Sequence, residues 1–219
     1  MQKDILWKAG ILAAIVFIAG LSLGIWLDEQ RVAATRSRLM DIDLQWNDAR
    51  LTSLYYQLHA GMDSRFCDSA IKNNFEFNDR IYKEGLLIER YEAVDRFAPE
   101  LVQEKRHYAL LQLQFWLNSI ALKESCNASY QTLVYFYSHY DESLMAIQKA
   151  QSAVLAEIKE TCGPQLLLIP IPLDMNIGTI SLIAAEYNVT SAPSILLNDK
   201  VLIGLRTKEE LQQLINCSS

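Results

Sequence analysis

LVYFYSHYDESL, residues 133–144, decides how the second half of the chain folds. Its first five residues are apolar or aromatic, which is typical of a buried strand. Asp141 then opens a helical pattern that continues to Gly163, and aspartate is a favoured N-cap residue. A strand that passes through a short corner into a helix predicts the start of a β-α-β unit.

The pattern of strands and helices continues to the end of the chain. It predicts a buried strand over 165–174 and a second helix over 178–189. A hairpin of two strands, 193–199 and 200–205, turns around Asn198-Asp199-Lys200. TKEE at Thr207 is a capping box for a last helix. The predicted order is therefore β-α-β followed by α-β-β-α, with a right-handed parallel crossover in the first unit.

VTSAPS, residues 189–194, lies between the second helix and the hairpin. With the element order, it resembles the thioredoxin-like fold over residues 130–217. The resemblance implies a βαβαββα domain in which Pro193 is a cis-proline that faces the corner at 138–141. The whole chain is also similar to membrane-anchored thioredoxin-like proteins of archaea.

The corner departs from that family at its reactive positions. Thioredoxin-like enzymes carry C-x-x-C here, because a helix N-terminus stabilises the attacking thiolate. This chain has Asp141-Glu142-Ser143-Leu144 instead. The resemblance therefore implies a protein without redox activity at this corner, not an enzyme, and without a cofactor.

Four cysteines allow two disulfides. In the thioredoxin-like arrangement the first and last helices run away from the corner on one face, which implies a Cys162–Cys217 bond. Cys67 and Cys126 then form a second bond at one end of a helical bundle. Two alternatives stay open: four buried free thiols, and an oxidoreductase-related protein that uses these cysteines outside the motif.

Residues 9–27 carry no charged side chain over nineteen positions, which is about the thickness of a membrane core. They predict a signal anchor or transmembrane helix over 1–28, with a cleaved signal peptide as the alternative. Paired cysteines and three glycosylation sequons favour a cytoplasmic N-terminus and an extracytoplasmic C-terminal part, as a single-pass membrane protein. The sequons are at Asn127, Asn188 and Asn216. Gly20 and Gly24 form a GxxxG spacing that predicts a homodimer contact.

Residues 29–125 have helical periodicity and few glycines or prolines. They predict three antiparallel helices, over 29–60, 64–93 and 98–124. His59 and His107 lack the further ligands of a metal site, so we expect solvated helix residues and no metal. The predicted fold class is thus α plus α/β, with a transmembrane helix, a helical bundle and a thioredoxin-like domain.

A net charge of -6 does not favour nucleic-acid binding. We expect a binding or scaffold module that holds an unknown protein or extended peptide by strand addition. The candidate groove residues are His139, Tyr140, Asp141 and Pro193, with His139 and Tyr140 expected on the surface. The alternatives are an accessory subunit of a membrane complex, and a hydrolase with His139 as base and Ser138 or Ser143 as nucleophile.

Overall fold

The computed structural model describes residues 12–13, 15–24, 26, 44, 47–52, 54–56, 64–92 and 98–217. These belong to two compact units, Met1–Leu44 and Gln45–Ser219. The boundary expected between a bundle and a separate domain, at 125–130, falls inside the second unit. The long helices at 64–92 and 99–126 and the sheet therefore belong to the same compact unit.

The first unit corrects the predicted membrane segment. Its described residues, all helical, are 12–13, 15–24, 26 and 44. In the described part of the chain, no helix combines the length and apolar character that crossing a bilayer requires. The predicted transmembrane helix or signal anchor and the single-pass location are therefore wrong, while dimerisation through Gly20 and Gly24 stays a prediction.

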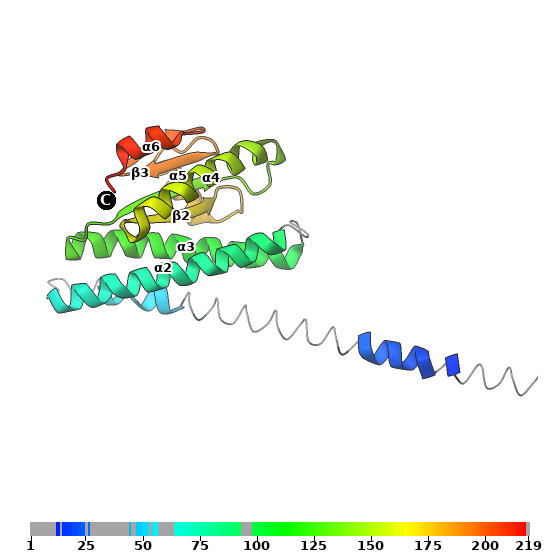
Figure 1. Ribbon diagram of the computed structural model, residues 1–219. Coiled ribbons are helices and arrows are strands. Elements are labelled where there is room, and N and C mark those ends of the chain that lie inside the picture. The colour runs from blue at the N-terminus through cyan, green and yellow to red at the C-terminus, as the bar shows by residue number, and fades with distance from the viewer. Residues whose placement is uncertain are drawn as a thin grey trace, which may run out of the picture. The chain divides into compact units, whose positions relative to one another are not determined.

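Two long helices, α2 (Ser64–Glu92) and α3 (Pro99–Cys126), run side by side in the second unit (Figure 1). Pro99 stands in the first turn of α3, where a missing N–H costs nothing. The helical residues 47–52 and 54–56 pack on this pair: Ala49 and Tyr56 are buried, and Asn118 donates a hydrogen bond to the Ala49 carbonyl at 2.8 Å. A disulfide joins Cys67 to Cys126 with 5.4 Å between Cα atoms.

The sheet has four strands in the order β2-β1-β3-β4. Their bounds are β1 (Gln131–Tyr137), β2 (Leu166–Pro172), β3 (Ser194–Leu197) and β4 (Lys200–Ile203). β1 pairs with β2 in parallel and with β3 antiparallel, and β3 and β4 form a hairpin. Asn198 and Asp199 turn this hairpin with left-handed φ values of 49° and 63°, which these two residue types tolerate.

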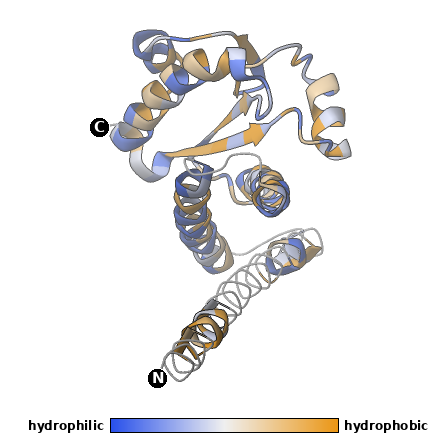
Figure 2. Cartoon of the chain, turned by 90° about the vertical axis from the view of Figure 1, so that its right-hand side faces the viewer, coloured by the Kyte–Doolittle hydropathy of each residue, from blue (hydrophilic) through white to orange (hydrophobic). Residues whose placement is uncertain are grey.

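Helices cover both faces of the sheet. The short turn η1 (Glu142–Leu144) leads into α4 (Met145–Cys162), which packs on one face with α6 (Lys208–Leu214). The turn η2 (Gly163–Gln165) connects α4 to β2, and α5 (Gly178–Glu186) lies with α3 on the other face. Figure 2 shows the strands between these layers in hydrophobic colours. The chain is thus mostly helical with one small mixed sheet, and together with the missing membrane span this corrects the predicted fold class.

A second disulfide joins Cys162, at the end of α4, to Cys217, after α6, with 5.2 Å between Cα atoms. Both pairings that the sequence suggests are therefore present. Because the chain has four cysteines, neither free thiols nor a reactive dithiol remain.

Candidate functional site

The corner after β1 is organised by one carboxylate that the sequence did not single out. Asp174, two residues beyond β2, accepts hydrogen bonds from the Ser138 hydroxyl, from the His139 N–H at 2.8 Å and from the Tyr140 N–H at 2.9 Å. Burial alone raises the pKa of Asp174, but these donors outweigh it and hold that pKa below its ordinary value. Gln148 on α4 accepts the Ser138 N–H at 2.5 Å.

Asp141 and Leu144 lie at the start of the helical segment that follows β1. Asp141 is exposed and caps η1, accepting the Ser143 N–H at 2.9 Å. Leu144 is half-buried. The carboxylate therefore performs the capping role that its position before a helix indicates.

His139 is buried, although the sequence suggested a surface position. Its side chain is 0% exposed, whereas the neighbouring Tyr140 is 45% exposed. The two rings contact edge to face with centroids 4.8 Å apart. Of the two corner aromatics, Tyr140 alone is available to a partner.

His139 belongs to a buried charged cluster with Glu92 and Lys105. Glu92, the last residue of α2, forms an ion pair with Lys105 on α3. The Nδ1 atom of His139 lies 3.3 Å from Glu92 Oε1 and 3.1 Å from Lys105 Nζ. Burial by itself raises the pKa of Glu92, but the hydrogen bond with His139 and the charge of Lys105 lower it below the ordinary value. These contacts join both long helices to the corner.

Pro193 lies at the end of β1 that leads into the corner. Its peptide bond with Ala192 is cis. Because Phe136 pairs with Ser194, the antiparallel register sets Pro193 opposite Tyr137. Pro193 itself is buried, and its carbonyl accepts the Gly204 N–H at 2.8 Å. The structure thus brings Tyr140, Asp141 and Pro193 to one end of the sheet, while the His139 side chain lies in the interior.

The corner does not form the serine–histidine pair that a hydrolase would need. The Ser138 hydroxyl donates to Asp174 and accepts the Asp141 N–H at 3.0 Å. The Ser143 hydroxyl donates to Asp141 at 2.5 Å. The Nδ1 atom of His139 faces Glu92 and Lys105 instead. The arrangement therefore orients the corner and does not activate a nucleophile.

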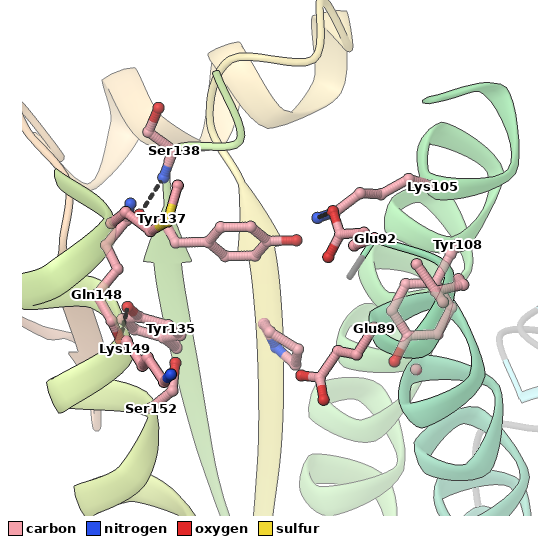
Figure 3. A pocket seen from close by; sticks show the side chains of 14 residues that line it. Glu89, Glu92, Lys105, Tyr108, Tyr135, Tyr137, Ser138, Gln148, Lys149 and Ser152 are labelled. Atoms are coloured by element: carbon pink, nitrogen blue, oxygen red, sulfur yellow. Dashed lines mark hydrogen bonds and ion pairs between the residues drawn. The ribbon is translucent and has the colours of Figure 1, made fainter. Parts of the chain in front are cut away.

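A pocket of about 270 Å³ lies beside the corner, between α4 and the pair α2–α3 (Figure 3). None of the four predicted groove residues lines it. Burial raises the pKa of Tyr137 well above its ordinary value, and the negative charge of Glu92 adds to this effect. Tyr137 therefore stays a neutral phenol. Its ring extends toward Glu92 and Lys105 in Figure 3, and the Lys105 ammonium lies 5.2 Å from the ring centroid.

Tyr108 of α3 also lines the pocket, and its hydroxyl donates to the Ile81 carbonyl at 3.2 Å and accepts from Gln112 at 2.5 Å. No local sequence pattern brings Tyr108, Glu92 and Tyr137 to one pocket, because these residues come from three separate elements.

The described residues contain no group of His, Cys, Asp and Glu that could hold a metal ion. The three sequon asparagines, Asn127, Asn188 and Asn216, are all exposed, so glycosylation at these positions stays a prediction.

Comparisons with known proteins do not assign a family. No family model matches the chain, and no curated protein matches it. One solved structure, titled "Structure of a malarial protein", is 21% identical and covers 39% of this chain and 92% of its own, with a TM-score of 0.31.

Proposed function

We propose that this protein is a redox-inactive, thioredoxin-like binding module that holds an extended peptide segment of a partner protein beside the corner. The observation that carries the proposal is the composition of this end of the sheet. The cis-proline Pro193 and the exposed Tyr140 lie beside the start of a helix. At the two positions where the thioredoxin-like resemblance would place cysteines, this chain has Asp141 and Leu144. The parallel β1–β2 pair and the β3–β4 hairpin also agree with the resemblance.

The state of the four cysteines supports the proposal that the protein is redox-inactive. Disulfide exchange requires a thiolate nucleophile. All four cysteines are in disulfides, and Cys162 stands at the opposite end of α4 from the corner. A helix of eighteen residues separates the two ends by about 27 Å. The Cys162–Cys217 bond therefore acts as a structural clamp.

The outer edge of the sheet supports the peptide-binding part. Among the described strands, β4 pairs with β3 alone, so its other edge has backbone groups for an added strand. Beside this edge, Ile203 and Leu205 are exposed apolar side chains two residues apart. They provide apolar contacts for an extended chain, while Tyr140 provides an aromatic one.

The test uses peptides selected by the wild-type chain from a random heptapeptide display library. Fluorescence anisotropy then measures their affinity for two variants that each remove an exposed tyrosine ring. We expect Tyr140→Ala to weaken binding about tenfold, as truncation of a contact aromatic does. Tyr82→Ala, on the far helix α2, leaves it unchanged. Equal binding by Tyr140→Ala and the wild type would refute the site, and reduction of insulin disulfides by the wild type would refute the redox-inactive assignment.

A further inference from the structure

The pocket between α4 and the long helices has aromatic and apolar walls. Tyr135 and Tyr137 of β1 line it and stack with their ring centroids 5.9 Å apart. Ile88 of α2, Pro170 of β2 and Met145 of α4 complete the apolar surface. Its volume of about 270 Å³ is near the lower end for small-molecule sites, so it suits a compact ligand.

Most polar groups of this pocket already have protein partners. Glu92 and Lys105 pair with each other and with His139, which does not itself line the pocket. The Tyr135 hydroxyl donates to the Gln148 carbonyl at 3.1 Å, and the Gln148 side chain accepts from Ser138. A ligand would therefore not displace these contacts, and the groups left for it are few.

Two charged side chains remain at the pocket without an ion-pair partner in the described part of the chain, Glu89 on α2 and Lys149 on α4. Glu89 extends from its helix across the pocket toward β2 in Figure 3. Burial raises the pKa of Tyr108 above its ordinary value, and the negative charge of Glu89 adds to this effect. Lys149 lies on the opposite wall beside Ser152 (Figure 3).

The tyrosine rings of the pocket indicate which of the two charged side chains, Glu89 or Lys149, pairs with a ligand. The face of a tyrosine ring attracts cations and repels anions. The protein already uses the Tyr137 ring in this way, because the Lys105 ammonium lies 5.2 Å from its centroid. A pocket lined by both the Glu89 carboxylate and three tyrosine rings favours an organic cation over an anion.

We propose that this pocket binds a small organic cation, an ammonium group attached to a compact apolar or aromatic body. The ammonium group pairs with Glu89, and the apolar body packs between Tyr137, Ile88 and Pro170. This site is separate from the peptide-binding edge beside Pro193, and its test does not depend on the proposed peptide binding.

Three probes that share one phenyl body and differ in charge test the proposal: 2-phenylethylammonium, 2-phenylethanol and phenylacetate. The full chain is titrated with each while the ¹³C-methyl signal of Met145, which lines the pocket, is followed by NMR. We expect 2-phenylethylammonium to bind most tightly, the neutral alcohol more weakly and phenylacetate least. Tighter binding of phenylacetate would assign the site to Lys149 and overturn the proposal, as would the absence of any Met145 shift with the ammonium probe.

Substitutions test whether Glu89 is the carboxylate that binds the ammonium group. Glu89→Gln should weaken 2-phenylethylammonium about fivefold, as expected for one exposed ion pair, and leave 2-phenylethanol unchanged. Glu76→Gln, on the same helix and outside the pocket, is the matched control and should have no effect. Ser152→Trp adds an indole ring to the wall of the pocket that Ser152 lines, and should abolish binding of the ammonium and alcohol probes. Unchanged affinity of Glu89→Gln for 2-phenylethylammonium would overturn the proposal.

Discussion

Asp174 shows how one residue can order a whole loop. Its two carboxylate oxygens accept three donors from three consecutive residues, Ser138 to Tyr140. Backbone N–H groups in a corner cannot pair within a helix or strand, so an outside acceptor satisfies them. The exposure of Tyr140 therefore depends on a residue 34 positions away.

Replacing Asp174 with Asn should lower stability in a pH-dependent way. The folded-state pKa of Asp174 lies below its ordinary value, so its contribution is present above the unfolded pKa of about 3.9 and is lost as pH falls through the lower folded pKa. Because the side chain is partly exposed, we expect a loss of about 1 kcal/mol at pH 7 that disappears in strong acid. Urea unfolding from pH 7 to pH 2 measures it. Asp199→Asn, in the hairpin turn, is the control, and a pH-independent loss in Asp174→Asn would contradict the linkage.

Gly85 is required by the close approach of Tyr108. A Cβ atom at position 85 would meet the Tyr108 hydroxyl. Glycine to alanine normally stabilises a helix interior by about 1 kcal/mol. Here we expect Gly85→Ala to destabilise the protein by about 1–3 kcal/mol, as overpacking does. The same substitution in a Tyr108→Phe background should lower the free energy of unfolding by less, because the hydroxyl is absent. If urea unfolding shows that Gly85→Ala is more stable than the wild type, the contact with Tyr108 does not require glycine.

At the scale of elements, patterns within one segment were predictable and contacts between segments were not. The strand expected from the apolar run at 133–137 is β1, and Thr207 caps α6 with the expected capping box. The His139 side chain is buried because Glu92 and Lys105 reach it from two other helices. No local pattern signals such a cluster. The uncharged run at 9–27 predicted a membrane span, which no helix among the described residues provides.

The Glu92–Lys105–His139 cluster predicts a large cost when one charge is removed. Lys105→Met leaves the half-buried Glu92 carboxylate without its ammonium partner, and we expect a loss somewhat below that of a fully buried pair, which is about 3–5 kcal/mol. The double variant Glu92→Met with Lys105→Met should recover much of this loss. Guanidinium unfolding measures both. Lys72→Met, which removes an exposed pair with Glu76, is the control and should cost under about 0.5 kcal/mol. Equal losses in the single and double variants would mean that the charges are not coupled.

The two disulfides should stabilise the protein to a similar degree. They close loops with sequence separations of 59 and 55 residues, for which the chain-entropy model gives about 4 kcal/mol each. Cys67→Ser with Cys126→Ser loosens the start of α2, whereas Cys162→Ser with Cys217→Ser loosens the seven-residue α6. Hydrogen exchange should separate these local effects, and guanidinium unfolding the global ones. If the denaturation midpoint of either double variant is unchanged, the disulfide that it lacks does not stabilise the protein.

At the scale of the whole second unit, one hydrophobic core crosses from the long helices into the sheet. Leu111 and Phe115 of α3 belong to the same buried cluster as Phe136 of β1 and Ile169 of β2. Because the helices and the sheet bury the same apolar surface against each other, the helices cannot unfold without exposing the apolar face of the sheet to water. The helices and the sheet should therefore unfold together, although the sequence suggested two domains.

Leu111→Ala tests this cooperativity. Leu111 is fully buried on α3, so its truncation should cost about 2–5 kcal/mol. If the unit unfolds as one, the slowest-exchanging amides of β1 and of α3 gain the same factor in hydrogen-exchange rate under conditions where exchange follows global unfolding. Leu117→Ala, at an exposed position of the same helix, should change both rates little. Faster exchange confined to α3 would mean that the sheet keeps its structure when the helices open, and that its own core, between β1 and α4, is sufficient.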